Sequence, residues 1–219
     1  MRKIVVSTFT SLDGVMQAPG GPAEDPTGGF TLGGWTFPWF DEALGAAMGE
    51  IFDRPFDLLL GRKTYDIFAA HWPYISDPDD AFATRFNRIT KYVAAHAEPR
   101  LDWKNSRWLG KDTVTALMEL KSEDGPNLMV QGSSDLLQTL WKEKLVDEFS
   151  VLTFPVVLGK GKRLFSQGVP PCALKTVKSR TFPTGVVVIT YRPDGAVRTG
   201  DFGNAEPSAA ELERRRTLA

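Results

Sequence analysis

The chain has 219 residues, of which 42% are hydrophobic and 24% charged, and this composition is typical of a globular protein rather than of a disordered or fibrous chain. Its 26 Lys and Arg nearly balance 27 Asp and Glu, so a formal net charge of −1 excludes a general attraction to nucleic acid or to an anionic membrane. Apolar runs such as 186–189 are too short to span a bilayer, and residues 1–3 lead directly into a strand pattern. We therefore expect a cytoplasmic protein that binds neither nucleic acid nor membrane.

Strand and helix patterns alternate along most of the chain. The predicted elements, in chain order, are a strand over 3–9, a helix over 41–52, a strand over 57–60, a helix over 64–69, a strand over 92–95, a helix behind Asp112, a strand over 127–131, a helix behind Ser133 or Ser134, and strands over 149–157, 173–182 and 186–192. The clearest helix is 41–52, because its apolar residues recur at helical spacing behind Asp41, a plausible N-cap.

This alternation predicts an α/β fold with a mixed, mainly parallel sheet flanked by helices. A turn signal at Pro183-Thr184-Gly185 joins the last two strands into a C-terminal antiparallel hairpin. We expect one domain over 1–192 and a tail over 193–219 that is mobile or packs on a neighbour, with an exposed charged helix over 209–217.

The segment 10–40 combines glycines and prolines with more aromatic side chains than a solvated linker carries. Two interpretations remain open for it. It is a loop packed on its own side chains, or it is a lid or wall over a flat, apolar ligand.

Metal and thiol chemistry have little support in the sequence. The chain has 1 cysteine, Cys172, so an internal disulfide and a zinc site built on several thiolates are excluded. The chain has 2 histidines, His71 and His96, and they lack the spacing of a metal-binding motif, so we expect no bound metal.

Three strand ends carry groups suited to phosphate. At Gly61-Arg62-Lys63-Thr64 a predicted strand ends at a glycine and a helix begins, so backbone N–H groups and two cations converge. At Gly132-Ser133-Ser134 another strand enters a helix, and its serines either meet an anion or cap the helix. The third, the basic bend 159–163, is better interpreted as structural, and neither a GxGxxG nor a Walker A pattern occurs.

Several short motifs occur in the same order along this chain as in a known protein superfamily. They are Ser11-Leu12-Asp13-Gly14, Gly61-Arg62-Lys63-Thr64-Tyr65, Gly132, the run from Leu145 to Phe149, the run from Pro155 to Gly161, and Leu164-Phe165. Together they make residues 2–192 closely resemble the dihydrofolate reductase-like superfamily. The nearest branch is similar to the C-terminal reductase domain of bacterial riboflavin biosynthesis, whose activity is 5-amino-6-(5-phosphoribosylamino)uracil reduction.

The resemblance implies a dihydrofolate reductase-like fold, an NADPH cofactor and a homodimer. Gly61, Arg62, Lys63 and Thr64 would hold cofactor phosphates, with Arg62 placed for the 2′-phosphate. Gly132, Ser133 and Ser134 would receive the pyrophosphate at a helix N-terminus.

Two positions depart from the pattern of the superfamily. Many relatives have two glycines at the second turn, whereas this chain has Ser133 after Gly132, so a Cβ narrows the approach of the pyrophosphate unless its hydroxyl compensates by donating a hydrogen bond. Relatives also commonly have Ser or Thr where this chain has Ala95 and His96. His96 either contacts the adenosine phosphate or simply ends a strand.

Three carboxylates are catalytic candidates by resemblance. Asp41 and Glu42 occupy the region of the carboxylate that contacts the pterin in dihydrofolate reductases, although they suit a helix cap and first turn equally well. Asp13 follows the first strand, where the family lines its nicotinamide and substrate pocket, although it also suits a turn before Gly14.

These residues predict an NADPH-dependent reductase of a small heterocyclic, pteridine-like or pyrimidine-like, or carbonyl substrate. The chain starts at its first reductase-like strand, so we expect no deaminase domain before it. Two other classes stay open: a non-catalytic module that binds NADP or another small ligand, and an oligomeric scaffold whose interface is the aromatic segment.

Overall fold

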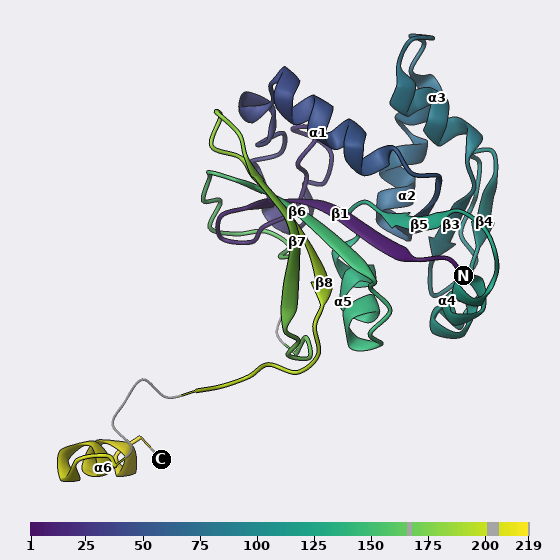
Figure 1. Ribbon diagram of the computed structural model, residues 1–219. Helices are drawn as coiled ribbons and strands as arrows, with labels where there is room; N and C mark the ends of the chain where they lie inside the picture. The colour runs from purple at the N-terminus through teal and green to yellow at the C-terminus, as the bar shows by residue number, and fades with distance from the viewer. Residues whose placement is uncertain (166–167, 201–205, 219) are drawn as a thin grey trace.

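The computed structural model describes residues 1–165, 168–200 and 206–218, and it is built around one sheet of 8 strands (Figure 1). The strands are β1 (Ile4–Ser11), β2 (Phe56–Gly61), β3 (Lys91–Ala94), β4 (Ser106–Trp108), β5 (Asn127–Val130), β6 (Glu148–Phe154), β7 (Leu174–Thr181) and β8 (Val187–Pro193). Their order across the sheet is β4-β3-β2-β5-β1-β6-β8-β7. The neighbouring strands β4, β3, β2, β5, β1 and β6 pair in parallel, and β8 pairs antiparallel with both β6 and β7. This confirms the predicted mainly parallel sheet and its closing hairpin.

Helices cover both faces of the parallel part of the sheet (Figure 1). They are α1 (Glu42–Phe52), α2 (Arg62–Ala69), α3 (Ala81–Arg88), α4 (Thr113–Ser122) and α5 (Ser134–Lys142), with short 3-10 turns η1 (Thr27–Gly29), η2 (Phe37–Trp39) and η3 (Trp72–Tyr74). Successive β1 residues alternate between the two faces: Ile4 and Val6 belong to the apolar cluster of α4 and α5, and Val5 belongs to that of α1, α2 and α3. This two-sided burial explains the continuous apolar runs of the strands.

Aspartates begin three of these helices. The side chains of Asp41, Asp80 and Asp112 accept hydrogen bonds from backbone N–H groups three residues further on, and thereby satisfy donors that the first helical turn leaves free. The predicted caps at Asp41 and Asp112 are confirmed.

The structure differs from the sequence-based prediction in three places. The strand predicted over 149–157 ends at Phe154, because Pro155 has no N–H for the ladder. Two elements were not predicted, the three-residue edge strand β4 and the helix α3. Helix α3 places Phe82 and Phe86 at i,i+4 behind the cap Asp80, a pattern that is too short to stand out from its polar surroundings.

Beyond β8 the described chain forms α6 (Ala209–Arg216), which has no buried residue and lies apart from the sheet in Figure 1. The described part of the chain contains no helix with the length and apolarity needed to cross a membrane.

The sheet has a topological switch point beside β5. The chain passes from β1 through α1 to β2 on one face, and from β5 through α5 to β6 on the other face. In open α/β sheets the carboxyl ends of strands at such a point border a crevice where ligands bind. The candidate site lies at this edge.

Candidate functional site

A cleft of about 1160 Å³ opens at the carboxyl ends of β1, β2, β3 and β5. This volume exceeds the roughly 300–1,000 Å³ of a typical small-ligand pocket, so the cleft has room for two ligands side by side. Its polar wall comes from the strand ends and helix starts at 61–64, 94–99, 111–114 and 131–135. Its apolar wall contains Phe9, Phe37, Phe40, Met48, Phe52, Ile67, Phe68, Trp72, Phe82 and Phe86.

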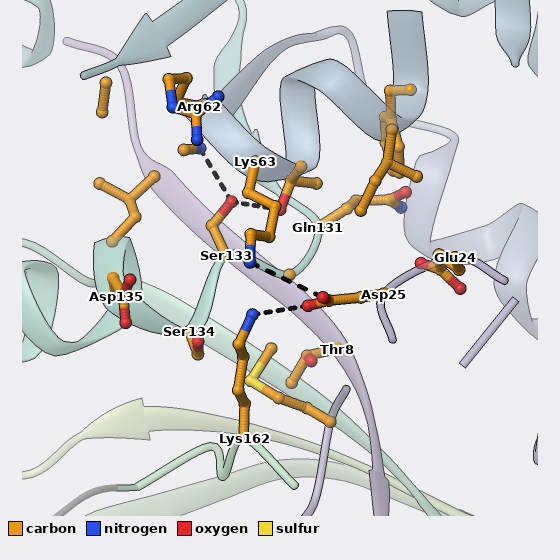
Figure 2. A pocket seen from close by; sticks show the side chains of 18 of the residues that line it. Thr8, Glu24, Asp25, Arg62, Lys63, Gln131, Ser133, Ser134, Asp135 and Lys162 are labelled. Atoms are coloured by element: carbon orange, nitrogen blue, oxygen red, sulfur yellow. Dashed lines mark hydrogen bonds and ion pairs between the residues drawn. The ribbon is translucent and has the colours of Figure 1, made fainter. Parts of the chain in front are cut away.

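The two predicted phosphate turns are joined by the hydroxyl of Ser133 (Figure 2). Its Oγ accepts the N–H of Gly61 at 2.8 Å and donates to Thr64 Oγ1 at 2.6 Å. Ser133 adopts a left-handed conformation with φ of 70°, and its side chain does not cap α5. A Cβ on Gly61 would lie 2.9 Å from the Ser133 Cβ and Oγ. Ser133, which stands where many relatives have glycine, therefore joins the two turns. Its hydroxyl takes up the Gly61 N–H, so that N–H is not free to bind a phosphate.

The start of α5 provides the remaining donors for an anion. The first helical N–H groups have no intrahelical partner, and the positive end of the helix dipole lies at the same point. Gly132 has φ of +81°, and a Cβ there would meet nothing closer than Thr64 Oγ1 at 4.0 Å. This open backbone at a helix N-terminus suits the close approach of a pyrophosphate.

Two lysines and one aspartate cross the cleft in front of these turns (Figure 2). Asp25 is 8% exposed, and its carboxylate lies 2.6 Å from Lys162 Nζ and 3.7 Å from Lys63 Nζ. Thr27 donates from both its N–H and its hydroxyl to the same carboxylate. The trio brings together the segment 10–40, the helix α2 and the basic bend 159–163, and it carries an excess of one positive charge.

The charges of the trio shape one another. Burial raises the pKa of Asp25, but the hydrogen bonds from Lys162 and Thr27 outweigh burial, so its net pKa is lowered. The neighbouring ammonium of Lys162, together with burial, lowers the pKa of Lys63. Burial also opposes the charge of Lys162, but the contact with Asp25 raises its pKa overall. Asp25 therefore stays ionised between the two lysines.

Arg62 lies at the outer edge of the polar wall. Its Nη1 forms an ion pair with Asp66 one turn further along α2, and the side chain is 56% exposed. A guanidinium has five donors, so most of its hydrogen-bonding capacity remains available to an incoming group.

Part of the segment 10–40 is a loop packed in the core, and another part forms a wall of the cleft, so each of its two interpretations holds for a part of it. Phe30 and Trp35 pack in the core against Phe154, and the Trp35 indole N–H donates to the Gln17 carbonyl at 2.8 Å. Phe37 and Phe40 instead line the cleft and remain exposed. The segment is therefore a packed loop that also builds one wall of the cleft.

All eight residues proposed to bind the cofactor line this one cleft: Gly61, Arg62, Lys63, Thr64, His96, Gly132, Ser133 and Ser134. His96 is exposed just after β3. Which of the eight contact a ligand stays a prediction.

The three proposed catalytic carboxylates lie outside the cleft lining. Asp41 Oδ1 accepts the N–H of Leu44 at 2.7 Å as the cap of α1, and Glu42 is exposed in the first turn of that helix. Asp13 accepts the hydroxyl of Ser11 at 2.6 Å and the N–H groups of Leu158 and Gly159, both at 3.0 Å. These placements favour the capping and turn roles, because nearby donors take up the carboxylates of Asp13 and Asp41, and Glu42 lies in the first turn of α1, where an acidic side chain suits the helix dipole.

Asp13→Asn should lower the free energy of unfolding at neutral pH by about 2 kcal/mol, because hydrogen bonds to a charged group are lost. The hydrogen bond from Ser11 and those from the two N–H groups lower the pKa of Asp13 to about 2 from an ordinary value of 3.8. The stabilisation is therefore fully present above pH 3.8 and is lost as the pH falls toward 2.

Urea unfolding from pH 7 down to pH 3 checks this expectation for Asp13. The exposed Asp79→Asn is the control and should change stability by less than about 0.5 kcal/mol. A difference between Asp13→Asn and wild type that stays constant with pH would contradict the ionic role.

The cleft lining also includes polar residues that were not predicted as site residues, among them Gln17, Glu24, Asp25 and Lys162. In the basic bend, Arg163 lies beside Asp13, and Lys162 lines the cleft, where it pairs with Asp25. Lys162 and Asp25 are 137 positions apart, so no local pattern links them. In the sequence, only the acidic pair 24–25 inside an aromatic, glycine-rich segment indicated that this segment could contribute charged groups to the cleft.

Comparisons with known proteins agree with this architecture. The uncharacterized protein YyaP of Bacillus subtilis is 28% identical over 200 residues, which cover 89% of this chain and 96% of that protein. A Shewanella sp. PV-4 protein assigned to riboflavin biosynthesis shares the fold with a TM-score of 0.60 and 20% identity, over 88% of this chain and 99% of that one. Dihydrofolate reductase from Enterococcus faecalis, complexed with NADP(H) and RAB-propyl, has a TM-score of 0.55 and 12% identity, over 88% of this chain and 96% of that one.

The sequence itself matches a protein family over most of its length. The matched family is described as the RibD C-terminal domain, and the match covers residues 2–188. That range includes the strands β1 to β7, the first two residues of β8 and every residue that lines the cleft. This chain therefore belongs to the RibD C-terminal domain family and has its dihydrofolate reductase-like fold.

Proposed function

We propose that this protein is an NADPH-dependent reductase that transfers a hydride to a small, flat heterocyclic or carbonyl substrate. The observation that carries the proposal is the direct contact of the two phosphate-type turns, Gly61 N to Ser133 Oγ at 2.8 Å, at the edge of a cleft with an aromatic wall. Family membership and the NADP(H) complex of the Enterococcus faecalis neighbour support the cofactor class.

The donors present in the cleft suit a phosphorylated dinucleotide. In this proposal the N-terminus of α5 and the hydroxyls of Thr64 and Ser134, which line the cleft, would hold the pyrophosphate, and Arg62 would bind the 2′-phosphate. A bound NADPH supplies the hydride, and the residues of the chain orient the two ligands and exclude water. The aromatic side chains would stack on a flat ring and keep the reacting atoms away from solvent.

Two measurements test the proposal. NADPH should quench tryptophan fluorescence, because Trp72 lines the cleft, and it should do so at lower concentrations than NADH, because only NADPH carries the 2′-phosphate. NADPH absorbance should then decrease in the presence of at least one member of a panel of pteridines, pyrimidines and small carbonyl compounds. Absence of NADPH binding would refute the proposal.

Arg62→Ala should weaken NADPH binding about tenfold or more while leaving NADH binding nearly unchanged, because only NADPH carries the 2′-phosphate. Fluorescence titration with both cofactors measures the two dissociation constants. Arg107→Ala is a matched control, since Arg107 is an exposed arginine on β4 outside the cleft lining. Equal weakening of both cofactors would remove the 2′-phosphate assignment.

A second candidate is a binding module without catalysis on the same fold. The positions of Asp13, Asp41 and Glu42 outside the cleft lining favour it. NADPH binding without consumption across the whole panel would support this module over the reductase. The homodimer also stays a prediction, which light scattering of the purified chain tests.

A further inference from the structure

Carboxyl groups that line the cleft are the natural sources of a proton, and most of those described there already have another role. Asp25 is held between two lysines, and Asp112 caps α4 with both of its oxygens on Thr115. Asp135 lies in the first turn of α5, where the proposed pyrophosphate would bind, and Glu98 is exposed beyond β3. Glu24 is the remaining carboxyl group among the described lining residues.

The position of Glu24 is fixed by its own loop. Its Oε2 accepts the N–H of Gly20 at 2.5 Å and that of Gly21 at 3.2 Å, and among the described residues no hydrogen bond reaches its Oε1. The backbone of 20–22 packs tightly on Gly33, where an added Cβ would lie 2.4 Å from the Gly21 carbonyl oxygen. The carboxyl group is therefore held by one oxygen and has the other oxygen available.

The surroundings of Glu24 raise its pKa above the ordinary value of 4.5. Burial raises its pKa, and this effect outweighs the two N–H hydrogen bonds that lower it. Of the charged groups that face it, the nearby Asp25 carboxylate also raises the pKa, and His71 lowers it. In Figure 2, Glu24 lies on the far side of Asp25 from Ser133.

We infer that Glu24 is the acid that protonates the substrate in the proposed reduction, and this inference rests on the proposed function. The carbon of a C=N or C=O group in the substrate accepts the hydride from C4 of the reduced nicotinamide. The adjacent nitrogen or oxygen accepts the proton as the O–H bond of Glu24 breaks. NADPH is oxidised to NADP⁺, the substrate gains two hydrogens, and the Glu24 carboxylate recovers its proton from water.

This role also defines the substrate class. An atom next to the reduced carbon must be a hydrogen-bond acceptor that faces the free oxygen of Glu24. The substrate is therefore an unsaturated ring or carbonyl compound with an exposed imine nitrogen or carbonyl oxygen, and its flat body lies against the aromatic wall.

The first test measures the ionisation of Glu24 without turnover. Carbon NMR of the full chain labelled at glutamate carboxyls follows every titration, and the signal absent from Glu24→Gln identifies Glu24. We expect its midpoint to lie above the value of about 4.3 for a free glutamate. A midpoint at or below that value would overturn the assignment, because the group would be fully ionised at the pH of reaction.

The second test uses the panel compound that wild type reduces fastest. Glu24→Gln keeps an oxygen for the N–H groups of Gly20 and Gly21, and it should lower kcat about 100-fold or more while leaving NADPH affinity unchanged. Wild-type kcat should decrease as the pH rises above the pKa of Glu24, and Glu24→Gln should lose this pH dependence. Glu119→Gln, an exposed substitution on α4 outside the cleft, is the control and should behave as wild type.

The two proposals fail in different ways. Wild type that does not bind NADPH would refute the proposed function itself. Wild type that binds and oxidises NADPH, together with a Glu24→Gln variant that retains more than a tenth of its kcat, would overturn the assignment of Glu24 alone. The reductase would then take its proton from water.

Discussion

Arg2→Met should lower the free energy of unfolding by about 3–5 kcal/mol, because it leaves a buried carboxylate without its counter-ion. The Arg2 side chain is 3% exposed and that of Asp57 is 13% exposed, and Nη2 lies 2.5 Å from Asp57 Oδ2. Arg2 also donates to the Pro126 carbonyl at 2.7 Å and to the Tyr92 hydroxyl at 3.2 Å. The guanidinium thus joins the start of β1 to β2, β3 and the turn before β5. Urea unfolding at neutral pH measures the loss.

A double variant separates the charge effect from the loss of contacts. Arg2→Met combined with Asp57→Asn should recover a substantial part of the loss, because asparagine is uncharged and still accepts the N–H of Thr90, now 3.1 Å from Asp57 Oδ1. If the double variant is as unstable as Arg2→Met alone, the lost contacts rather than the unpaired charge explain the effect.

Gly61→Ala should weaken NADPH binding about 100-fold, a change of about 2.7 kcal/mol in binding free energy. The new Cβ would lie 2.9 Å from both the Cβ and the Oγ of Ser133, closer than real Cβ contacts allow. The two turns must then separate, and the anion-binding groups on them move apart. Fluorescence titration measures the dissociation constant, and circular dichroism confirms that the variant is folded.

The matched rescue is Gly61→Ala with Ser133→Gly. Glycine at 133 removes both atoms that clash, and it suits the left-handed φ of 70° at that position. The double variant should bind NADPH better than Gly61→Ala does, and Ser133→Gly alone serves as its reference because it loses the hydroxyl that joins the turns. A double variant that binds no better than Gly61→Ala would show that the spacing of the turns is not the cause.

Most of the fold follows from local patterns in the sequence. The apolar runs of β1, β2 and β5 are continuous because both faces of the sheet are covered, and the helix after Asp41 is marked by its cap and its apolar spacing. The elements α3 and β4 were missed because contacts from other parts of the chain stabilise them. Phe86 of α3, for example, packs against Phe56 and Phe68.

The polar wall of the cleft was also predictable from residue types at strand ends. Gly61 ends the strand β2 and Gly132 follows the strand β5, each just before a helix, and parallel strands in neighbouring positions place their carboxyl ends at the same edge. The contact through the Ser133 hydroxyl was not predictable, because it depends on the distance between the two turns in the folded chain.

The choice of carboxylates in the cleft was a matter of tertiary structure. Asp13 and Asp41 lie outside the cleft lining, whereas Glu24 and Asp25 reach the cleft from a loop whose path is set by packing on the core. A carboxylate binds whichever donors the folded chain brings within about 3 Å. The sequence specifies which acids are available, but the donors around each of them exist only after the sheet, the helices and the aromatic loop have come together.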